Sequence, residues 1–304
     1  MRRRSDLAAS LPILASALLW GTLWVPLRAL QATGDRAPLL TAIGFVLPLA
    51  ALTPFAIRRW PQLRRGGLPL CAAGLGLALA IALYAEGLVR GSVSRVVLLF
   101  YLMPVWTTIF ARLRLSQPIT SRRIASIGLG LAGLLVVYGP GSAGPAASTA
   151  GDWMGLAAGV CWAATMVLFL PAAGQTPFDR VFAQFAFLAP AYLAVRLAPG
   201  AQAAAASEPL AGAPPLPLGW VLAFGLAWML PVVWLTIFGA SRLEPGRAAV
   251  LFMLEIAVAL GSAAVLAGEP FGAREALGAA LIAGAGLTEL MPVSRPAETR
   301  GEAG

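Results

Sequence analysis

The stretch EGLVRGSVSRVVLLFYL at residues 86–102 recurs in altered form as FGASRLEPGRAAVLFML at residues 238–254. A shift of 152 residues superposes matching residue types: Gly87 on Gly239, Arg90 on Arg242, Arg95 on Arg247, Leu99 on Leu251, Phe100 on Phe252 and Leu102 on Leu254. Nearer the start of each half the shift is 142, which places Trp20 on Trp162. Paired glycine, arginine and tryptophan are uncommon chance matches, so the chain is two copies of one unit.

The chain has the composition of a membrane protein. Of the 304 residues, 59% are hydrophobic and only 12% are charged, whereas an average soluble domain has about 25% charged residues. A spanning helix needs about 20 mostly apolar residues. Ten such segments are predicted, at 9–31, 38–57, 68–89, 93–111, 124–139, 153–173, 181–198, 218–240, 248–266 and 275–291. The connections between them are too short for a soluble domain.

Five spans per copy is an odd number, so the second copy must cross the membrane in the opposite direction to the first. The sequence predicts an all-α polytopic membrane protein whose ten transmembrane helices form two inverted five-helix repeats, at residues 1–140 and 151–292. Inverted repeats are typical of secondary transporters, which hold the substrate near the midplane between the repeats.

Arginine placement predicts the orientation. All 22 basic residues are arginine, and ten spans put 16 of them on the side of the two termini and 6 on the opposite side. Because cytoplasmic loops carry the excess of positive charge, we expect a multi-pass protein of the inner membrane with both termini in the cytoplasm. The net charge of +9 is then a topology signal, and no nucleic-acid partner is expected.

The composition also argues against several chemistries. Without His there is no Ser–His nucleophile pair and no His metal ligand, and without Lys there is no Schiff base. Cys71 and Cys161 both lie in apolar runs and are interpreted as small core residues. The glycine motif at 128–133 lies within an apolar span, where a nucleotide-binding loop does not occur. We therefore expect no enzyme, no cofactor and no metal.

Glu255 is the most informative candidate, because it lies inside the ninth span. A carboxylate inside a membrane is costly and usually faces a cavity or a partner. It is predicted to contact the substrate or a coupling ion. The alternative, a fixed structural hydrogen bond to a neighbouring helix, has about equal weight.

Aromatic and thioether side chains provide further candidates for substrate binding. Trp20 and Trp24 are four residues apart and share one helix face, as do their counterparts Trp162 and Met166. Symmetric placement favours a wall around an apolar or amphipathic solute, although ordinary packing is the commoner role of any one such side chain. Small residues accompany them at the spacing that lets helices approach closely: Ala17 and Gly21, Gly155 and Gly159.

Tyr84, Tyr101 and Pro104 complete the predicted substrate-binding set. Proline removes a helical hydrogen bond and can bend a helix at a cavity, and the two phenols offer polar groups near the same depth. A packing kink with satisfied tyrosines is the competing interpretation.

Charged residues form two clusters at pseudo-equivalent turns, Glu86, Arg90 and Arg95 in the first copy and Arg242, Glu244 and Arg247 in the second. Glu86 and Arg90 are four apart and can pair on a helix. The hypothesis is that the clusters form matching gating rims on the outer and inner sides. Simple anchoring of helix ends at the interface is the alternative.

Three stretches are similar to the EamA-type carriers of the drug/metabolite transporter superfamily: LLWGTLWVPLRAL at 18–30, YLMPVWTTIF at 101–110 and LFMLEIAVALGSAAVLAGEPFGAREALGAALIAGAG at 251–286. The resemblance covers nearly the whole chain and includes Gly268-Glu269. It implies a ten-helix carrier of small organic solutes with a cavity lined by spans 1, 3, 4, 6, 8 and 9. Two residues depart from the family pattern: Gln117 stands where the first copy usually has Glu, and Ile256 where the second usually has Pro.

The inverted repeats predict alternating-access transport, and the family resemblance implies that the solutes are amino acids or related metabolites, moved in the direction of export. A flippase for a lipid or lipid-linked precursor, built on the same architecture, is the alternative. The expected partners are a small-molecule solute and the lipid bilayer, and ten spans suffice for a monomeric pathway.

Overall fold

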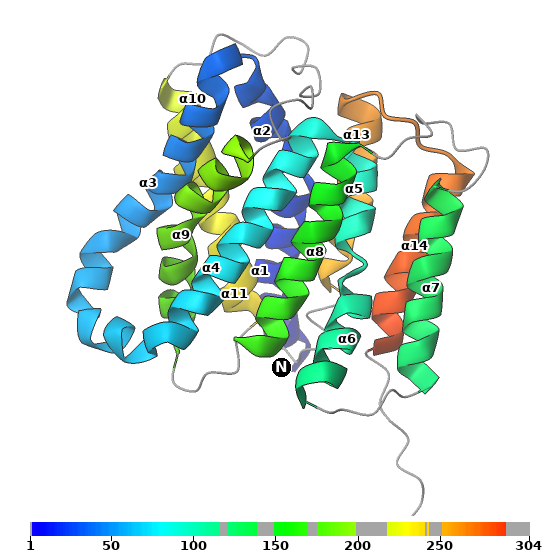
Figure 1. Cartoon of the computed structure of the whole chain (residues 1–304), viewed down its shortest axis with the longest axis horizontal. Helices are drawn as coiled ribbons and strands as arrows, with labels where there is room; N and C mark the ends of the chain where they lie inside the picture. The colour runs from blue at the N-terminus through cyan, green and yellow to red at the C-terminus, as the bar shows by residue number, and fades with distance from the viewer. Residues whose placement is uncertain are drawn as a thin grey trace, which may run out of the picture.

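The computed structural model describes residues 2–115, 121–138, 149–169, 175–198, 218–240, 242 and 251–289, and every regular element within them is a helix (Figure 1). In the first repeat these are α1 (Arg2–Gly21), α2 (Trp24–Gln31), the 3-10 turn η1 (Gly34–Arg36), α3 (Ala37–Arg58), α4 (Trp60–Arg90), α5 (Val93–Phe100), α6 (Met103–Leu115) and α7 (Ser121–Tyr138). In the second they are α8 (Ala150–Leu168), α9 (Pro177–Leu197), α10 (Leu218–Leu222), the π-helical segment η2 (Ala223–Met229), α11 (Leu230–Ala240), α13 (Leu254–Leu266) and α14 (Ala273–Glu289).

These helices form a ten-helix membrane bundle. Seven stretches of the described chain are long and apolar enough to cross a membrane: Ser10–Gln31, Gly34–Arg58, Trp60–Arg90, Val93–Arg114, Ala150–Leu168, Pro177–Leu197 and Leu218–Ala240. The shorter helices α7, α13 and α14 run beside them and complete the ten (Figure 1). Helices satisfy every backbone polar group internally, which the hydrocarbon region requires.

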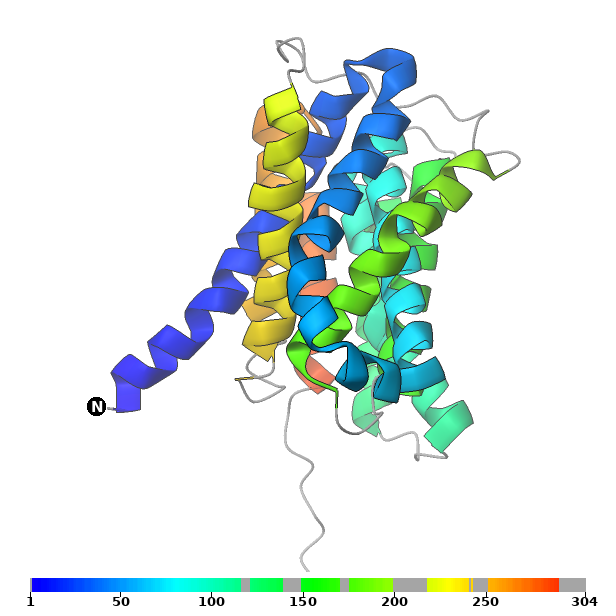
Figure 2. The same ribbon diagram turned by 90° about the vertical axis from the view of Figure 1, so that its left-hand side faces the viewer.

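The two repeats run in opposite directions. Arg28, late in the first span, donates to the backbone carbonyls of Leu88 and Gly91. Gly151, at the start of α8, packs against the same Gly91. The first span of the second repeat therefore begins at the end of the bundle where the first span of the first repeat finishes. Figure 2 shows the N-terminal end of α1 projecting beyond the bundle.

Contacts between the repeats follow the same pseudo-symmetry. Helix α4 packs on α8 and α9, and its counterpart, η2 with α11, packs on α1 and α3. Likewise α5 and α6 pack on α8, while α13 packs on α1, and α7 pairs with α14. Each repeat thus buries its own faces mainly against the other, so neither repeat forms the interior alone.

Glycines set how closely these helices approach. A Cβ at Gly155 would lie 2.7 Å from the carbonyl oxygen of Val96, and one at Gly159 would lie 2.6 Å from that of Phe100. In the pseudo-equivalent region, a Cβ at Gly21 would lie 2.7 Å from the side chain of Val258. The small residues that the sequence analysis paired are therefore places where one backbone lies directly against another helix.

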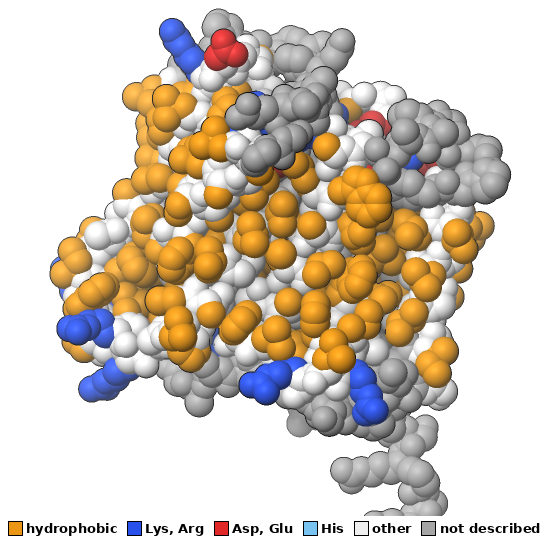
Figure 3. Space-filling model, viewed as in Figure 1, with side chains coloured by type: hydrophobic (Ala, Val, Ile, Leu, Met, Phe, Trp, Pro, Cys, Tyr) orange, Lys and Arg blue, Asp and Glu red, His pale blue; other side chains and the backbone are white. Residues whose placement is uncertain are grey.

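The outer surface suits a bilayer. Hydrophobic side chains cover the middle of the molecule, and arginine side chains gather along the lower edge of the face in Figure 3. Among the exposed apolar side chains are Leu135 and Val265, at 70% and 82% exposure. Such a surface would aggregate in water and is matched to lipid tails.

The glycine contacts predict a contrast between two alanine substitutions. Gly159→Ala places a methyl group against the Phe100 carbonyl and should lower the thermal midpoint in detergent by several degrees. Gly128→Ala, where nothing lies within 4 Å, should leave the midpoint unchanged or raise it, since Ala favours a helix over Gly by ~1 kcal/mol. Equal midpoints for both variants would contradict the assigned packing.

Candidate functional site

Helix breaks at pseudo-equivalent positions organise the centre of the bundle. The fourth span is interrupted at Tyr101–Leu102, between α5 and α6, and the ninth is interrupted at Met253, just before α13. The shift of 152 residues that relates the repeats superposes Tyr101 on Met253. Both turns are local departures within a span: Tyr101 has φ −72° and ψ 3°, Met253 has φ −63° and ψ −17°, and Val93–Arg114 is still one apolar stretch long enough to cross a membrane. Irregular helices near the midplane are a usual setting for binding sites in membrane carriers.

Proline placement explains part of the interruption. Pro104 lies in the first turn of α6, where its missing N–H costs nothing because first-turn N–H groups have no intrahelical partner. The first span is interrupted too, at Thr22–Leu23, and Pro26 lies in the first turn of α2 that follows. In both cases proline starts a new helix segment, whereas the sequence analysis expected only a bend at Pro104.

Glu255 lies in the first turn of α13, directly after the break. The positive end of a helix dipole stabilises a carboxylate at this position. Its side chain is buried and accepts two hydrogen bonds, from Tyr84 Oη at 3.0 Å and from Tyr101 Oη at 2.8 Å. Within the described part of the chain no arginine lies within 4 Å of it. The structure therefore brings three predicted residues together, two phenols and one carboxylate, and places no cation beside that carboxylate within the described residues.

The Tyr101 hydroxyl has a second acceptor, the backbone carbonyl of Phe252, at 2.9 Å. A phenol carries one proton, so it bonds fully with either Phe252 or Glu255 at any moment. If Glu255 carries a proton, its own O–H can donate to Tyr101, which then donates to Phe252. The arrangement thus accepts both protonation states of Glu255 without moving a side chain.

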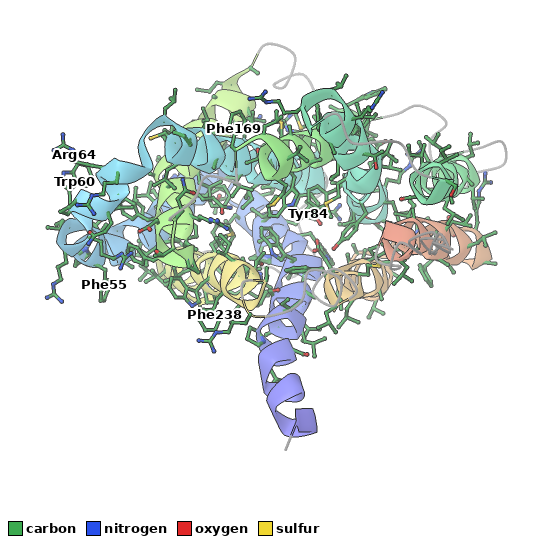
Figure 4. The ribbon with its side chains drawn as sticks, turned by 90° about the horizontal axis from the view of Figure 1, so that it is seen from below. Phe55, Trp60, Arg64, Tyr84, Phe169 and Phe238 are labelled. Carbon is green, nitrogen blue, oxygen red and sulfur yellow. The ribbon has the colours of Figure 1, made fainter. Side chains whose placement is uncertain are left out.

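Aromatic rings from both repeats surround this group. Tyr84 meets the ring of Trp20 edge-on at 6.3 Å between centroids and that of Phe100 at 4.9 Å, and Phe100 in turn meets Trp162 at 6.1 Å. Trp20 Nε1 donates to Thr236 Oγ1 at 2.8 Å. Seen along the helices, Tyr84 lies near the middle of the bundle, far from the rim residues Phe55, Trp60, Arg64, Phe169 and Phe238 (Figure 4).

The other two predicted wall residues lie elsewhere. Trp24 is fully buried and donates to Ser262 Oγ at 3.0 Å, and the guanidinium of Arg28 lies 5.3 Å from its ring centroid. It belongs to a layer between Glu255 and the end of the first span. Met166 is 37% exposed and does not join the buried aromatic group.

The described members of the two charged clusters have different surroundings. Glu86 and Arg90 form a buried pair at 2.5 Å, with Arg196 at 4.0 Å from Glu86, and Arg95 lies 3.6 Å from Asp152 of α8. In the second repeat Arg242 is exposed and its guanidinium stacks 4.1 Å from the ring centroid of Phe238. Glu244 and Arg247 lie outside the described residues. The first-repeat cluster therefore joins helices inside the bundle, whereas Arg242 lies at its surface.

Sequence reasoning missed a pair that the structure makes prominent, Arg28 and Glu269. Their side chains are 8% and 11% exposed and approach to 3.4 Å. Glu269 was noted only as part of the Gly268-Glu269 resemblance, and Arg28 only as one of the arginines on the outer side. The signal that could have joined them is an acid and a base at two span ends predicted on the same side. Among the described residues, no group of three acidic or cysteine side chains converges to hold a metal ion.

Comparison with known proteins agrees with this architecture. The model of the EamA-like transporter family matches the chain twice, over residues 7–139 and 149–288. One solved crystal structure is 20% identical, with a TM-score of 0.56, and the alignment covers 93% of this chain and 96% of that one. At this identity the likeness is one of fold. A search of curated proteins finds no match.

The difference between the charged clusters predicts unequal effects on stability. Arg90→Ala leaves the Glu86 carboxylate buried with the Tyr192 phenol and the more distant Arg196, and removing one partner of a buried pair costs ~3–5 kcal/mol. Arg242→Ala removes an exposed side chain and should cost less than ~0.5 kcal/mol. Thermal unfolding in detergent compares the two, and similar losses would show that the clusters are equivalent after all.

Proposed function

This chain belongs to the EamA-like transporter family, and from that premise we propose that it is a secondary carrier exporting amino acids or related metabolites by alternating access. The family consists of membrane transporters rather than enzymes. The observation that carries the finer proposal is Glu255, a buried carboxylate at a helix break, hydrogen-bonded by two phenols and without a cation among the described residues. Intramembrane acids of this kind mark substrate and ion pathways.

The chemistry of the group supports a solute that carries an ammonium. A primary ammonium would supply the positive partner that the described residues do not place beside the Glu255 carboxylate. The faces of Trp20, Tyr84 and Phe100 would add cation–π attraction and would cover an apolar side chain of the solute. Tyr84, Tyr101 and Trp20 come from the first repeat and Glu255 from the second. A solute held between them would contact both repeats, as alternating access requires.

Coupling to protons fits the same geometry. Glu255 would hold either a proton or the solute's ammonium, because both bind to the same two oxygens. The chain from Glu255 to Tyr101 to the Phe252 carbonyl accommodates the protonated form. Exchange of one for the other would expel solute as protons enter. Among the described residues, Glu255 is the acid to which this central group donates hydrogen bonds.

Removing the charge of Glu255 is the direct test. In proteoliposomes loaded with a panel of amino acids, Glu255→Gln should reduce exchange by at least about thirtyfold, the equivalent of ~2 kcal/mol. Tyr84→Phe, which removes one neutral hydrogen bond, should reduce it about fivefold. Glu275→Gln is the matched control. Glu275 accepts a hydrogen bond from the Gly272 N–H at the start of α14, so this variant should transport normally.

Two outcomes would contradict the proposal. Full exchange by Glu255→Gln would remove the residue from the pathway. Scrambling of fluorescent lipid without saturable solute flux would favour the flippase of the same fold. A proton-coupled carrier should in addition acidify the lumen as solute leaves, and the glutamine variant should lose that signal together with flux.

We also propose that both termini face the cytoplasm of the cell, with the molecule in the inner membrane. The arginine asymmetry of 16 to 6 supports this orientation. After Arg58, at the end of α3, a reporter that works only in the cytoplasm should be active and one that works only in the periplasm should be inactive. After Thr33, in the turn between α2 and η1, the periplasmic reporter should be active and the cytoplasmic one inactive. The reverse pattern would overturn the orientation.

A further inference from the structure

Glu269, in the turn after α13, connects to α2 and to the start of α5. This contact lies at the end of the bundle opposite the start of α1. Its carboxylate accepts five hydrogen bonds, from Ser92 Oγ at 2.8 Å, Val93 N at 2.7 Å, Ser94 N at 3.0 Å, Ser94 Oγ at 3.0 Å and Arg28 at 3.4 Å. Four of these donors lie at the N-terminus of α5. Two of the four are backbone N–H groups, which lack helical partners there, and the helix dipole favours an anion at this position. The acid thereby caps a helix of the other repeat.

Arg28 extends the connection. Its Nε donates to the Leu88 carbonyl at 3.1 Å, and one terminal nitrogen donates to the Gly91 carbonyl at 2.8 Å. These are carbonyls at the end of α4, so Arg28 joins the end of the first span to the ends of α4 and α13. Because Glu269 belongs to the second repeat and its donors to the first, this end cannot separate along the repeat boundary without breaking the cluster.

The backbone positions Glu269 for this role. Gly268 follows α13 with a φ of +64°, a left-handed conformation that side chains disfavour. The turn brings the Glu269 N–H within 3.2 Å of the Ala263 carbonyl, so the residue is held by main-chain as well as side-chain bonds.

The inverted repeat places different chemistry at the other end of the molecule. The 152-residue shift puts Gln117 in the place of Glu269, and Glu244, Pro245 and Gly246 in the places of Ser92, Val93 and Ser94. The counterpart of Arg28, by the shift of 142, is Leu170. These counterparts lie outside the described residues, and only their residue types enter the comparison. The acceptor has lost its charge, Pro245 has no N–H, and neither the hydroxyls nor the guanidinium is present.

We propose that Arg28, Glu269 and the 92–94 turn are the gating residues of one end of the carrier, a latch whose acid, hydroxyls and guanidinium the sequence does not repeat at the shifted positions. The empty carrier then rests with the latched end closed, although the repeats themselves are nearly symmetric. This inference presumes the alternating access of the proposed function. Solute binding must be strong enough to break the latch, which makes its opening the step that discriminates between solutes.

Cysteine labelling reports on the latch without requiring transport. Ser262 lies on α13 midway between Glu255 and Glu269 and accepts a hydrogen bond from Trp24, across the repeat boundary. In a background with Cys71 and Cys161 replaced by alanine, Ser262→Cys is exposed in cells to a membrane-impermeant thiol reagent. Labelling should be slow with the latch intact. Glu269→Gln should accelerate it about tenfold, because hydrogen bonds to charged groups are worth ~1.5 kcal/mol or more.

Two further variants separate a latch from general loosening. Ser94→Ala removes one hydroxyl donor and leaves Glu269 and Arg28 in place, so its labelling rate should fall between those of the parent and Glu269→Gln. Glu275→Gln removes a nearby acid whose cap stays within the second repeat, and it should label at the parental rate. Acceleration in all three variants, or in none of them while each remains monodisperse, would overturn the latch. Because labelling needs no transport, its failure is distinguishable from failure of the proposed function.

Discussion

The Glu255 carboxylate and the helix break beside it impose the central constraint on this molecule. Interrupting a membrane helix frees backbone groups that hydrocarbon cannot satisfy, and a buried carboxylate adds a further demand. Here the helix break and the buried carboxylate partly satisfy each other. The α13 dipole stabilises Glu255, and the Tyr101 phenol bonds both the carboxylate and the free Phe252 carbonyl. The break and the acid therefore persist together, and both depend on tyrosines supplied by the other repeat.

That dependence explains why the two repeats are so closely interlocked. The tyrosines reach Glu255 only if α4 and α5 keep their position against the second repeat, and Gly155 and Gly159 allow α8 to lie directly on the backbone of α5. Rocking between two states requires that the two repeats stay in firm contact near the centre of the bundle. It also requires that they can separate at either end. The Arg28–Glu269 cluster at one end is polar, and polar contacts can be exchanged for water when that end opens.

Much of this architecture is predictable from the sequence, because hydropathy and the internal repeat are long-range patterns that survive divergence. Ten spans, their inversion and the Glu86–Arg90 pair all follow from spacing. Glu255, Tyr84 and Tyr101 were each selected for being polar within an apolar span. Their convergence, however, depends on how helices of different repeats are rotated, which periodicity does not determine.

The features that sequence reasoning missed are those created by tertiary contact. The interruption at Met253 has no proline to announce it, and it becomes visible only beside its pseudo-equivalent at Tyr101. The five-fold hydrogen bonding of Glu269 needs a left-handed Gly268 and the free N–H groups of α5. Met166 shared the expected helix face with Trp162, yet it is partly exposed, because a single helix face can extend past the edge of a neighbour.

In the proposed function, the two ends of the carrier open alternately about the Glu255 group. Spin labels report it most directly, with one pair at Ala32 and Phe271 on the latched end and another at Arg64 and Arg242 on the opposite end, all four being exposed. Distances within each pair are measured by pulsed electron resonance in lipid nanodiscs, with and without a transported solute. Alternating access predicts that solute lengthens one of the two distances and shortens the other. Distances that stay fixed, or that lengthen together, would contradict it.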